Sequence, residues 1–538
     1  MKVSKNSLLL MMLALMLSVV LAACASEPDG DSAPAEDADE EQATNGEGSG
    51  GDLVIATLSE AVSLDPHGSN DTPSTNIASN IYEQLVWQDE NLELQPGLAE
   101  SWEPIDETTW EFKLREGIKF HDGTEFNADA VKANIDRILD PEVASPRSFL
   151  FNMITEVEVV DPTTVRFHTE YPFAPLPAHL AHNGGGMISP QSIEEDYAAM
   201  EAGEEPGSVI SSNPVGTGYF KFDEWASGQY VRLVNNPDYW GEPAKLDSVT
   251  FKVVPEDLTR IAELETGDSH ISDPLSPSDV SRVENTEGLY VNHQQSVAVS
   301  YIGFNMDKEP FNDVRVRQAI SMAIDKDQII QGTFDGAGIP AIGPIAPNVF
   351  GYDESVEGLE YNVERAKELL AEAGYPDGFS TTISTNDNRE RIDAATNVQA
   401  QLAEIGIDAE VEVVEWGAYL EQTASGNSEM FVLGWTTVTG DADYGLYPLF
   451  HSDNVGEPGN RTFLRDEELD ALLLEARQTT DEAERLALYK EAQEKLVELA
   501  PMLFIHHQEF LLGVREEVKG LWQHPTQILM LHDVYIEE

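Results

Sequence analysis

Hydrophobic and polar residues follow two different periods in the part of the chain after residue 51. Trp110, Phe112 and Leu114 alternate with charged residues, which is the two-residue period of a half-buried strand. The runs 230–234 and 249–254 are rich in β-branched and apolar residues and predict two further strands. Strands are therefore expected in several separate segments of the chain.

Residues that commonly cap helices stand before three segments with the helical period of 3.6 residues. Asn127 precedes a run whose apolar residues share one helix face. Asn362 opens a second run, which Gly374 ends. Asp481 and Glu484 resemble a capping box in front of a third. Because such helices alternate irregularly with the strands and no internal repeat is present, the sequence predicts a mixed α/β fold.

The first 24 residues have the pattern of a bacterial lipoprotein signal. Two lysines precede the apolar run 8–23, which is too short to require a permanent membrane span. The run ends in Leu-Ala-Ala-Cys, which resembles a lipobox, where the signal is cut before the cysteine and the thiol takes a diacylglyceryl group. We therefore expect a signal peptide at 1–23 and lipidation of Cys24, with two or more acyl chains as the anchor.

Residues 24–51 differ in composition from everything that follows them. They are rich in Asp, Glu, Ala, Gly and Ser and contain no aromatic residue. Such a segment cannot bury enough apolar surface to fold, and its charges repel one another. The sequence predicts a lipidated, disordered acidic tether here, which places the folded part outside the cytoplasm at the outer face of the cell membrane. In an envelope with two membranes this location is the periplasm.

The charge and length of the chain limit the partners and the domain organisation that are expected. The chain has 98 acidic and 31 basic residues, a formal net charge of −67. This charge repels nucleic acid and anionic headgroups, so neither is an expected partner, and it suits a saline or alkaline exterior. A length of 538 residues exceeds what one hydrophobic core serves, so two or more domains are expected. With one cysteine, the chain forms no intramolecular disulfide.

Four groups of motifs occur in a fixed order along the chain. They are LAESW at 98–102 with WEFKLREGIKFHDGT at 110–124, NPVGTG at 213–218 with NPDYW at 236–240, FNDVRVRQAI at 311–320, and VKG at 518–520. Together they span about residues 53–538. This set resembles the large extracellular solute-binding proteins of peptide and nickel transport systems, known as family 5.

The resemblance implies an α/β, bilobal fold of the periplasmic-binding-protein type, with an additional inserted domain and a ligand cleft between lobes that close by hinge motion. Residues 52–85, 214–300 and 512–538 would form the main domain of lobe 1, residues 86–213 the inserted domain, and residues 301–511 lobe 2. The resemblance further implies a monomeric receptor that hands its solute to the permease and ATPase of an ABC importer.

The segment after Gly434 most resembles the branch of the family that binds glutathione and short peptides. Peptide binders place an Asp soon after the Gly-Trp pair, where it takes the ligand's α-ammonium group. Here Val438 stands where several dipeptide binders carry that Asp. The resemblance therefore implies that Asp441 or Asp443 binds the α-ammonium group. Trp435 and Tyr444 would supply apolar walls. The alternative interpretation is a solvated Asp pair in an acidic loop, with Trp435 in a core.

A peptide also carries a carboxylate, which the planar fork of an arginine binds best. Arg389 and Arg391 precede a helix in a region where family members often place such an Arg. Arg461 follows the acidic segment, and Arg147 would project from the opposite lobe. Glutathione has two carboxylates and would suit two of these arginines. Each of them alone is more often a surface charge.

Two other functions are alternatives. A nickel receptor would use His179 and His182, or His506 and His507, although their apolar surroundings favour structural histidines. A secreted hydrolase would need a catalytic motif, but Gly-x-Ser-x-Gly, His-Glu-x-x-His and the phosphate loop are missing from the sequence. Acylation of Cys24 would remove the one thiol nucleophile. We therefore expect a receptor that is not an enzyme and that holds no metal or cofactor.

Overall fold

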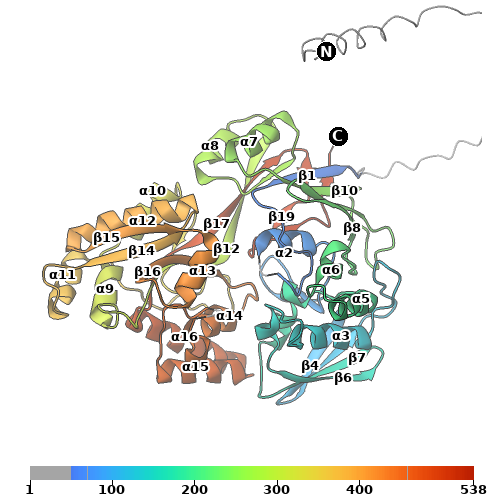
Figure 1. The fold of residues 1–538 in the computed structure, drawn as a ribbon, viewed down its shortest axis with the longest axis horizontal. Coiled ribbons are helices and arrows are strands. Elements are labelled where there is room, and N and C mark those ends of the chain that lie inside the picture. Colours follow the sequence, from blue (N-terminus) through green and yellow to red (C-terminus); the bar gives the residue numbers. More distant parts are fainter. Residues whose placement is uncertain (1–49, 70, 457–458, 538) are drawn as a thin grey trace, which may run out of the picture. The chain divides into compact units, whose positions relative to one another are not determined.

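The computed structural model describes residues 50–537, apart from residue 70 and residues 457–458. The predicted signal peptide, Cys24 and nearly all of the predicted tether lie outside the described residues. Within the described part, no helix combines the length and apolar character needed to cross a bilayer. Helices and strands alternate as predicted, and the molecule is a mixed α/β protein (Figure 1).

One sheet of eleven strands runs through the molecule, with ten strands in a continuous path and one short strand beside it. In order across the path they are β15 (Asp408–Val414), β14 (Ser380–Asn386), β16 (Met430–Thr436), β12 (Leu289–Phe304), β17 (Met502–Arg515), β11 (Ile271–Asp273), β1 (Asp52–Thr57), β10 (Ser248–Val253), β9 (Tyr230–Asn235) and β8 (Phe220–Ala226), while β13 (Ile339–Pro340) pairs with β17. The predicted strands at 230–234 and 249–254 are confirmed as β9 and β10.

The long strands β12 and β17 connect the two lobes. They pair antiparallel from Leu289 opposite Arg515 to Gly303 opposite Met502. At one end β17 pairs with β11 of lobe 1, and at the other β12 pairs with β16 of lobe 2. The register shifts between Gln295 and Val299, where the pairing of the two strands is interrupted. Such an irregularity bends and twists a strand, so the sheet changes direction between the lobes.

Lobe 2 packs helices on both faces of its part of the sheet. Alternate residues of β12 enter different cores: Ile302 and Phe304 belong to one, and Val299 and Tyr301 to the other. One face carries α9 (Val314–Met322), α10 (Lys326–Thr333), α11 (Val363–Glu372) and α12 (Arg389–Leu402), and the other α14 (Ala442–Phe450), α15 (Glu467–Gln478) and α16 (Glu482–Leu499), with α13 (Trp416–Ala424) beside β14. The predicted caps of α11 and α16 are confirmed, because Asn362 and Asp481 accept backbone N–H groups of those helices.

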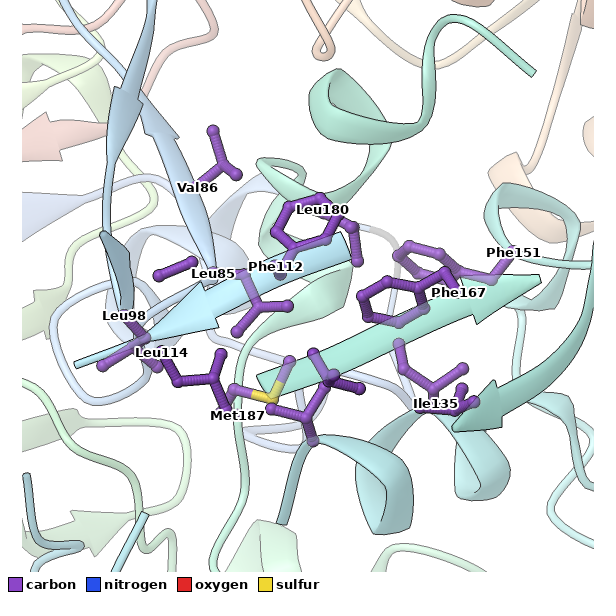
Figure 2. Packing of buried hydrophobic residues seen from close by; sticks show 14 of the residues in the cluster. Leu85, Val86, Leu98, Phe112, Leu114, Ile135, Phe151, Phe167, Leu180 and Met187 are labelled. Carbon is purple, nitrogen blue, oxygen red and sulfur yellow. The ribbon is translucent and has the colours of Figure 1, made fainter. Parts of the chain in front are cut away.

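The inserted domain has its own antiparallel sheet of four strands. Its order is β4 (Ala99–Asp106), β5 (Thr109–Leu114), β7 (Thr164–Thr169) and β6 (Ile154–Asp161), and α3 (Ala128–Leu139) packs against it. Figure 2 shows Phe112 and Phe167 in the core, with ring centroids 5.2 Å apart and edge to face. The predicted strand around Phe112 and the helix capped by Asn127 are both confirmed.

The main domain of lobe 1 draws its core from distant segments of the chain. Leu53, Phe220, Leu233 and Leu512 are all fully buried in one cluster. Around it lie α2 (Thr72–Ala78), α5 (Pro190–Glu201), α6 (Ser208–Ser212), α7 (Asp257–Thr266) and α8 (Val280–Glu284), the short strand pair β18 (Val518–Lys519) and β21 (Tyr535–Ile536), and the pair β19 (Trp522–Gln523) and β20 (Leu529–Met530). The core of the inserted domain also takes residues from α4 (Leu176–Leu180) and from the strand pair β2 (Val86–Gln88) and β3 (Leu94–Pro96).

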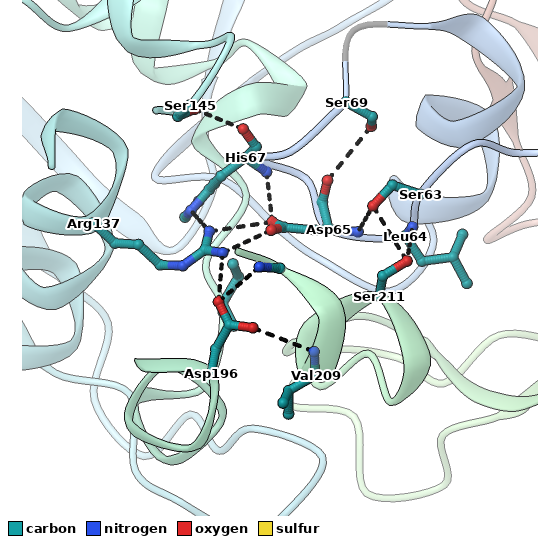
Figure 3. Close-up of polar contacts among 12 residues, drawn as sticks. Ser63, Leu64, Asp65, His67, Ser69, Arg137, Ser145, Asp196, Val209 and Ser211 are labelled. Atoms are coloured by element: carbon teal, nitrogen blue, oxygen red, sulfur yellow. Dashed lines mark hydrogen bonds and ion pairs between the residues drawn. The ribbon is translucent and has the colours of Figure 1, made fainter. Parts of the chain in front are cut away.

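A buried ion pair joins α3 to the loop after β1 and to α5 (Figure 3). Arg137 is 1% exposed, and its Nη2 lies 2.7 Å from Asp65 Oδ2 and 3.0 Å from Asp196 Oδ2. Burial, together with the charge of Arg137, holds the pKa of His67 well below its usual range, so its neutral Nδ1 accepts a bond from Arg137 Nη1 at 3.0 Å. One guanidinium therefore compensates two carboxylates that have no access to water.

Replacing Arg137 by Met should destabilise the fold strongly, because Asp65 and Asp196 would stay buried without a counter-charge. Breaking a buried pair in this way costs about 3–5 kcal/mol in free energy of unfolding. The control is Arg166→Met, which removes a partly exposed pair with Glu111 at 2.8 Å and should cost less than about 1 kcal/mol. Urea unfolding measures the free energy of unfolding of both variants. Equal losses would mean that the buried pair contributes no more to stability than the partly exposed one.

Candidate functional site

Two cavities lie at the carboxyl ends of the strands β1, β11, β14 and β16, between the lobes. Ligands of α/β proteins commonly bind at this edge. Cavity A measures about 220 Å³ and cavity B about 490 Å³. Lobe 1 and lobe 2 both contribute to each of them. The segment 523–528 near the C-terminus is a shared wall, since Thr526 and Ile528 line cavity A while Gln523 and Gln527 line cavity B.

Cavity A combines charged groups of lobe 1 with the end of β16 in lobe 2. Asp71 and Arg147 line one side, and Trp435 and Tyr444 the other. Asp71 is held in place because its Oδ1 accepts the Ser74 N–H at 2.9 Å as the cap of α2. Arg147 is 3% exposed, and burial lowers the pKa of its guanidinium. The cavity thus presents a carboxylate, a guanidinium and two aromatic walls to a bound molecule.

Tyr444 of lobe 2 packs into the core of the inserted domain. Its backbone oxygen accepts the Trp435 Nε1–H at 2.9 Å, and its ring lies 5.3 Å from that of Trp435. On its other side the ring lies 6.0 Å from Phe149 and 5.8 Å from His182. Burial raises the pKa of Tyr444 to about 12, so the phenol is neutral. Three predicted site residues, Arg147, Trp435 and Tyr444, therefore line one cavity.

Asp441 and Asp443 lie outside the linings of cavities A and B, each in a buried ion pair. Arg485 contacts Asp441 through both nitrogens of its fork, at 2.7 and 2.8 Å. Arg477 lies 3.1 Å from Asp443, and His179 lies 3.4 Å from it on the side of the inserted domain. A ligand amine would have to compete with these guanidinium groups. The predicted amine-binding role of Asp441 or Asp443 stays a prediction, and these contacts weigh against it.

The other predicted arginines lie apart from cavity A. Arg389 lines cavity B, but its side chain is 87% exposed and lies 3.7 Å from Asp393. Arg391 donates to Asn386 Oδ1 at 3.0 Å, and Arg461 to the Leu420 oxygen at 2.5 Å. Neither Arg391 nor Arg461 belongs to the lining of either cavity. Their assignment to a ligand stays a prediction.

Cavity B is strongly acidic. Two guanidinium groups, Arg260 and Arg389, face seven carboxylates in its lining: Asp257, Asp273, Asp335, Asp387, Glu390, Asp393 and Glu509. Burial raises the pKa of Asp273 to about 7, because the nearby charge of Arg260 offsets only part of the desolvation. Sequence patterns single out none of these carboxylates, since they come from separate segments that meet only in the folded protein.

The histidines considered for nickel have structural partners. His179 Nδ1 lies 2.8 Å from the Leu150 oxygen, and His182 Nδ1 accepts the Gly184 N–H at 2.9 Å. His507 Nδ1 lies 3.2 Å from the Ala298 oxygen, while His506 packs on Phe334. Among the described residues no group of three or more His, Cys, Asp or Glu side chains is arranged to hold a metal ion.

Comparison with known proteins identifies relatives over nearly the whole chain. The sequence model of the family described as bacterial extracellular solute-binding proteins, family 5 Middle, matches residues 93–457. The glutathione-binding protein GsiB of Escherichia coli (strain K12) is 35% identical over 496 residues, which cover 90% of this chain and 94% of GsiB.

Solved structures share the fold. The periplasmic binding protein DppA of Helicobacter pylori, in complex with the peptide STSA, superimposes with a TM-score of 0.81 at 32% identity, covering 91% of this chain and 99% of DppA. The oligopeptide-binding protein AppA of Bacillus subtilis, in complex with a nonapeptide, gives a TM-score of 0.79 at 29% identity, covering 91% and 100%. The bilobal fold with an inserted domain and an interlobe cleft is thereby confirmed.

Acid should remove the stabilisation that Asp443 provides. Burial alone would raise the pKa of its carboxyl, but Arg477 and His179 lower it to about 2, below the ordinary value of 3.8. A group with a lowered pKa in the folded state stabilises fully above the unfolded value and ceases to do so as the pH falls through the folded value. We expect the difference in free energy of unfolding between the wild type and Asp443→Asn to shrink by about 2 kcal/mol from pH 5 to pH 2.

The measurement is urea unfolding at several pH values. Asp453→Asn is the control, because the Asp453 side chain is 81% exposed and its difference from the wild type should vary little with pH. A pH-independent difference for Asp443→Asn would contradict the buried, ionised state of this carboxylate.

Proposed function

The chain belongs to family 5 of the bacterial extracellular solute-binding proteins, and from this membership we propose that it captures short peptides, glutathione among them, for the permease and ATPase of an ABC importer. Its relatives and structural neighbours are solute-binding proteins and not enzymes. One observation carries the proposal: Arg147 of lobe 1 and Trp435 and Tyr444 of lobe 2 line the same interlobe cavity. A ligand there touches both lobes and favours their closed arrangement by its contacts with each.

Arg147 is the proposed partner of a ligand carboxylate. A guanidinium binds a carboxylate with two parallel hydrogen bonds, and such charge-assisted bonds are stronger where water is excluded. The lowered pKa of Arg147 reports that its charge is poorly solvated, and an arriving carboxylate would offset this cost. Trp435 and Tyr444 would cover the apolar part of the ligand beside it. Arg389, Arg391 and Arg461 remain alternative carboxylate partners.

The edge of β16 offers backbone groups to an extended peptide. Its residues from Met430 to Thr436 pair with β12 on one side. On the other side, β14 pairs only with Met430 and Phe431, so among the described residues no strand covers the edge at Gly434 and Trp435, which line cavity A. A peptide lying along such an edge gains backbone hydrogen bonds that do not depend on its sequence.

We also propose the domain boundaries and the anchor that the sequence predicts. The main domain of lobe 1 would comprise 52–85, 214–300 and 512–538, the inserted domain 86–213, and lobe 2 301–511. Separate hydrophobic clusters support this division in outline, because one cluster draws mainly on residues 85–187 and two others mainly on the second half of the chain. The end of the 86–213 segment differs, since Ile188, Ile193 and Ile210 pack into the core of the main domain. Lipidation of Cys24 would tether the receptor to the outer face of the membrane as a monomer.

A ligand panel tests the function. Dipeptides, tripeptides or glutathione should raise the midpoint of thermal unfolding by mass action and bind in calorimetry. Arg147→Gln should weaken that binding by about ten- to hundredfold, the value of a charged hydrogen bond of about 1.5–3 kcal/mol. Arg465→Gln is the matched control and should change affinity by less than about threefold, because this side chain is 52% exposed and lines neither cavity. Binding of nickel salts alone, or turnover of a peptide, would contradict the proposal.

The anchor is tested separately by Cys24→Ser, which removes the one thiol of the chain. In cells that carry the lipoprotein machinery, the wild type should fractionate with membranes and partition into detergent. The variant should lose both properties while it keeps ligand binding, because the cysteine lies far outside the folded part in sequence. A wild-type protein without acyl chains in mass spectrometry would refute the lipidation of Cys24.

A further inference from the structure

Cavity B contains polar groups that the fold buries without satisfying. In an interior, polar side chains are nearly always hydrogen-bonded, so a cluster of unsatisfied ones needs an explanation. Two such side chains, His506 in β17 and Gln523 in β19, line this cavity together with Asp273 at the end of β11, whose carboxylate accepts no hydrogen bond from the described residues. They come from three strands near the junction of the lobes, and each is at least nine-tenths buried.

Asp273 is the charged member of the group. It is 7% exposed, and among the described residues no hydrogen bond or ion pair reaches its carboxylate. Arg260 is the cation whose charge acts on Asp273, but its Nη1 and Nη2 donate to other groups, and its Nε is buried without a hydrogen-bond partner among the described residues. Nη1 donates to the Val254 oxygen at 2.8 Å, and Nη2 to Asp257 Oδ1 at 2.5 Å. A carboxylate buried in this way is costly to the fold unless a ligand compensates it.

The two neutral groups add further acceptors. Gln523 is 1% exposed, and within the described part of the chain neither its amide oxygen nor its amide nitrogen has a hydrogen-bond partner. His506 is 1% exposed and its Nδ1 is likewise unsatisfied there. Burial and the neighbouring His507 lower the pKa of His506 to about 3, so its imidazole is neutral and one ring nitrogen can accept a hydrogen bond.

We propose that cavity B binds an ammonium group of the transported solute, with Asp273 as its counter-ion and Gln523 and His506 as further acceptors. An ammonium group has three or more N–H donors and no acceptor, which matches one carboxylate, one amide oxygen and one imidazole nitrogen. Leu275, Phe334 and Phe510 also line the cavity and suit an alkyl stem behind the charge.

The acidic composition of the whole chain does not account for this arrangement. A net charge of −67 is carried by solvated surface carboxylates, which need no partner, whereas Asp273 is withdrawn from water. The surrounding carboxylates of cavity B add an attractive potential for a cation and oppose an anion. The inference deepens the proposed peptide function, since it assigns the amine end to cavity B and leaves the carboxylate end to Arg147 in cavity A.

The test compares Asp273→Asn with the wild type by calorimetry at pH 8. The probes are lysyl-alanine, norleucyl-alanine, their N-acetylated forms and 1,5-diaminopentane. Asp273→Asn should weaken binding of every probe that places an ammonium group in cavity B by about ten- to hundredfold. N-acetyl-norleucyl-alanine should be unaffected. Loss of affinity on acetylation identifies the peptide terminus as the source, and a preference for lysyl over norleucyl probes identifies the side chain.

Two further variants control for the change of charge and for misfolding of Asp273→Asn. Asp408→Asn makes the same charge change at an exposed position on the edge strand β15 and should leave all affinities unchanged. Gln523→Leu should weaken binding of the same probes as Asp273→Asn. It tests the proposal on its own if Asp273→Asn does not fold. Asp273→Asn itself should unfold at a higher temperature than the wild type at pH 8, because it removes a buried charge that lacks a partner.

The outcomes separate this inference from the peptide function. If peptides bind and neither Asp273→Asn nor Gln523→Leu changes any affinity, the ammonium site is refuted and the function stands. If only diaminopentane binds, and does so through Asp273, the ammonium site stands and the peptide function is refuted. Absence of binding by every probe refutes both.

Discussion

Buried aspartates that need a cation constrain this molecule more than any other feature, because the chain has 98 acidic and only 31 basic residues. Arg137, Arg477 and Arg485 are each no more than 7% exposed, and all three are paired with buried aspartates. An uncompensated charge in these places would cost several kcal/mol, so each pair fixes the elements that carry it. Arg137 fixes α3 against lobe 1. The other two fix α15 and α16 against α14, and α14 carries Tyr444 into the interlobe cavity.

This constraint explains which predictions succeeded. Asn127, Asn362 and Asp481 act on backbone groups three residues away, so the sequence predicts their helices reliably. The roles of Asp441 and Asp443 depend on arginines that are 44 and 34 residues distant, and no local pattern reports them. The placement of Arg147, Trp435 and Tyr444 in one cavity followed from resemblance to a family of known architecture. No sequence pattern predicts the unsatisfied groups of cavity B, because burial is a property of the assembled fold.

The two cavities differ in the charge that they offer, and this difference bears on selection. Cavity A holds Arg147, whereas carboxylates dominate cavity B, and the segment 523–528 borders both. A solute with opposite charges at its ends would fit in one orientation and would meet like charges in the other. Discrimination by such repulsion is effective because the reversed solute places like charges together at both ends. Net charge and spacing of the termini, more than side-chain shape, would then decide which solutes are accepted.

The position of β17 has a consequence for how the chain is made. This strand lies between β11 and β12 in the middle of the sheet, yet it ends only at residue 515 of 538. Until the ribosome has produced it, β11 is paired only with β1, and the two halves of the sheet cannot join. Pairing of segments so far apart in sequence is slow, because a long loop must close first. The central sheet of the nascent chain therefore stays incomplete through almost all of its synthesis, which favours passage through a membrane channel before this sheet forms.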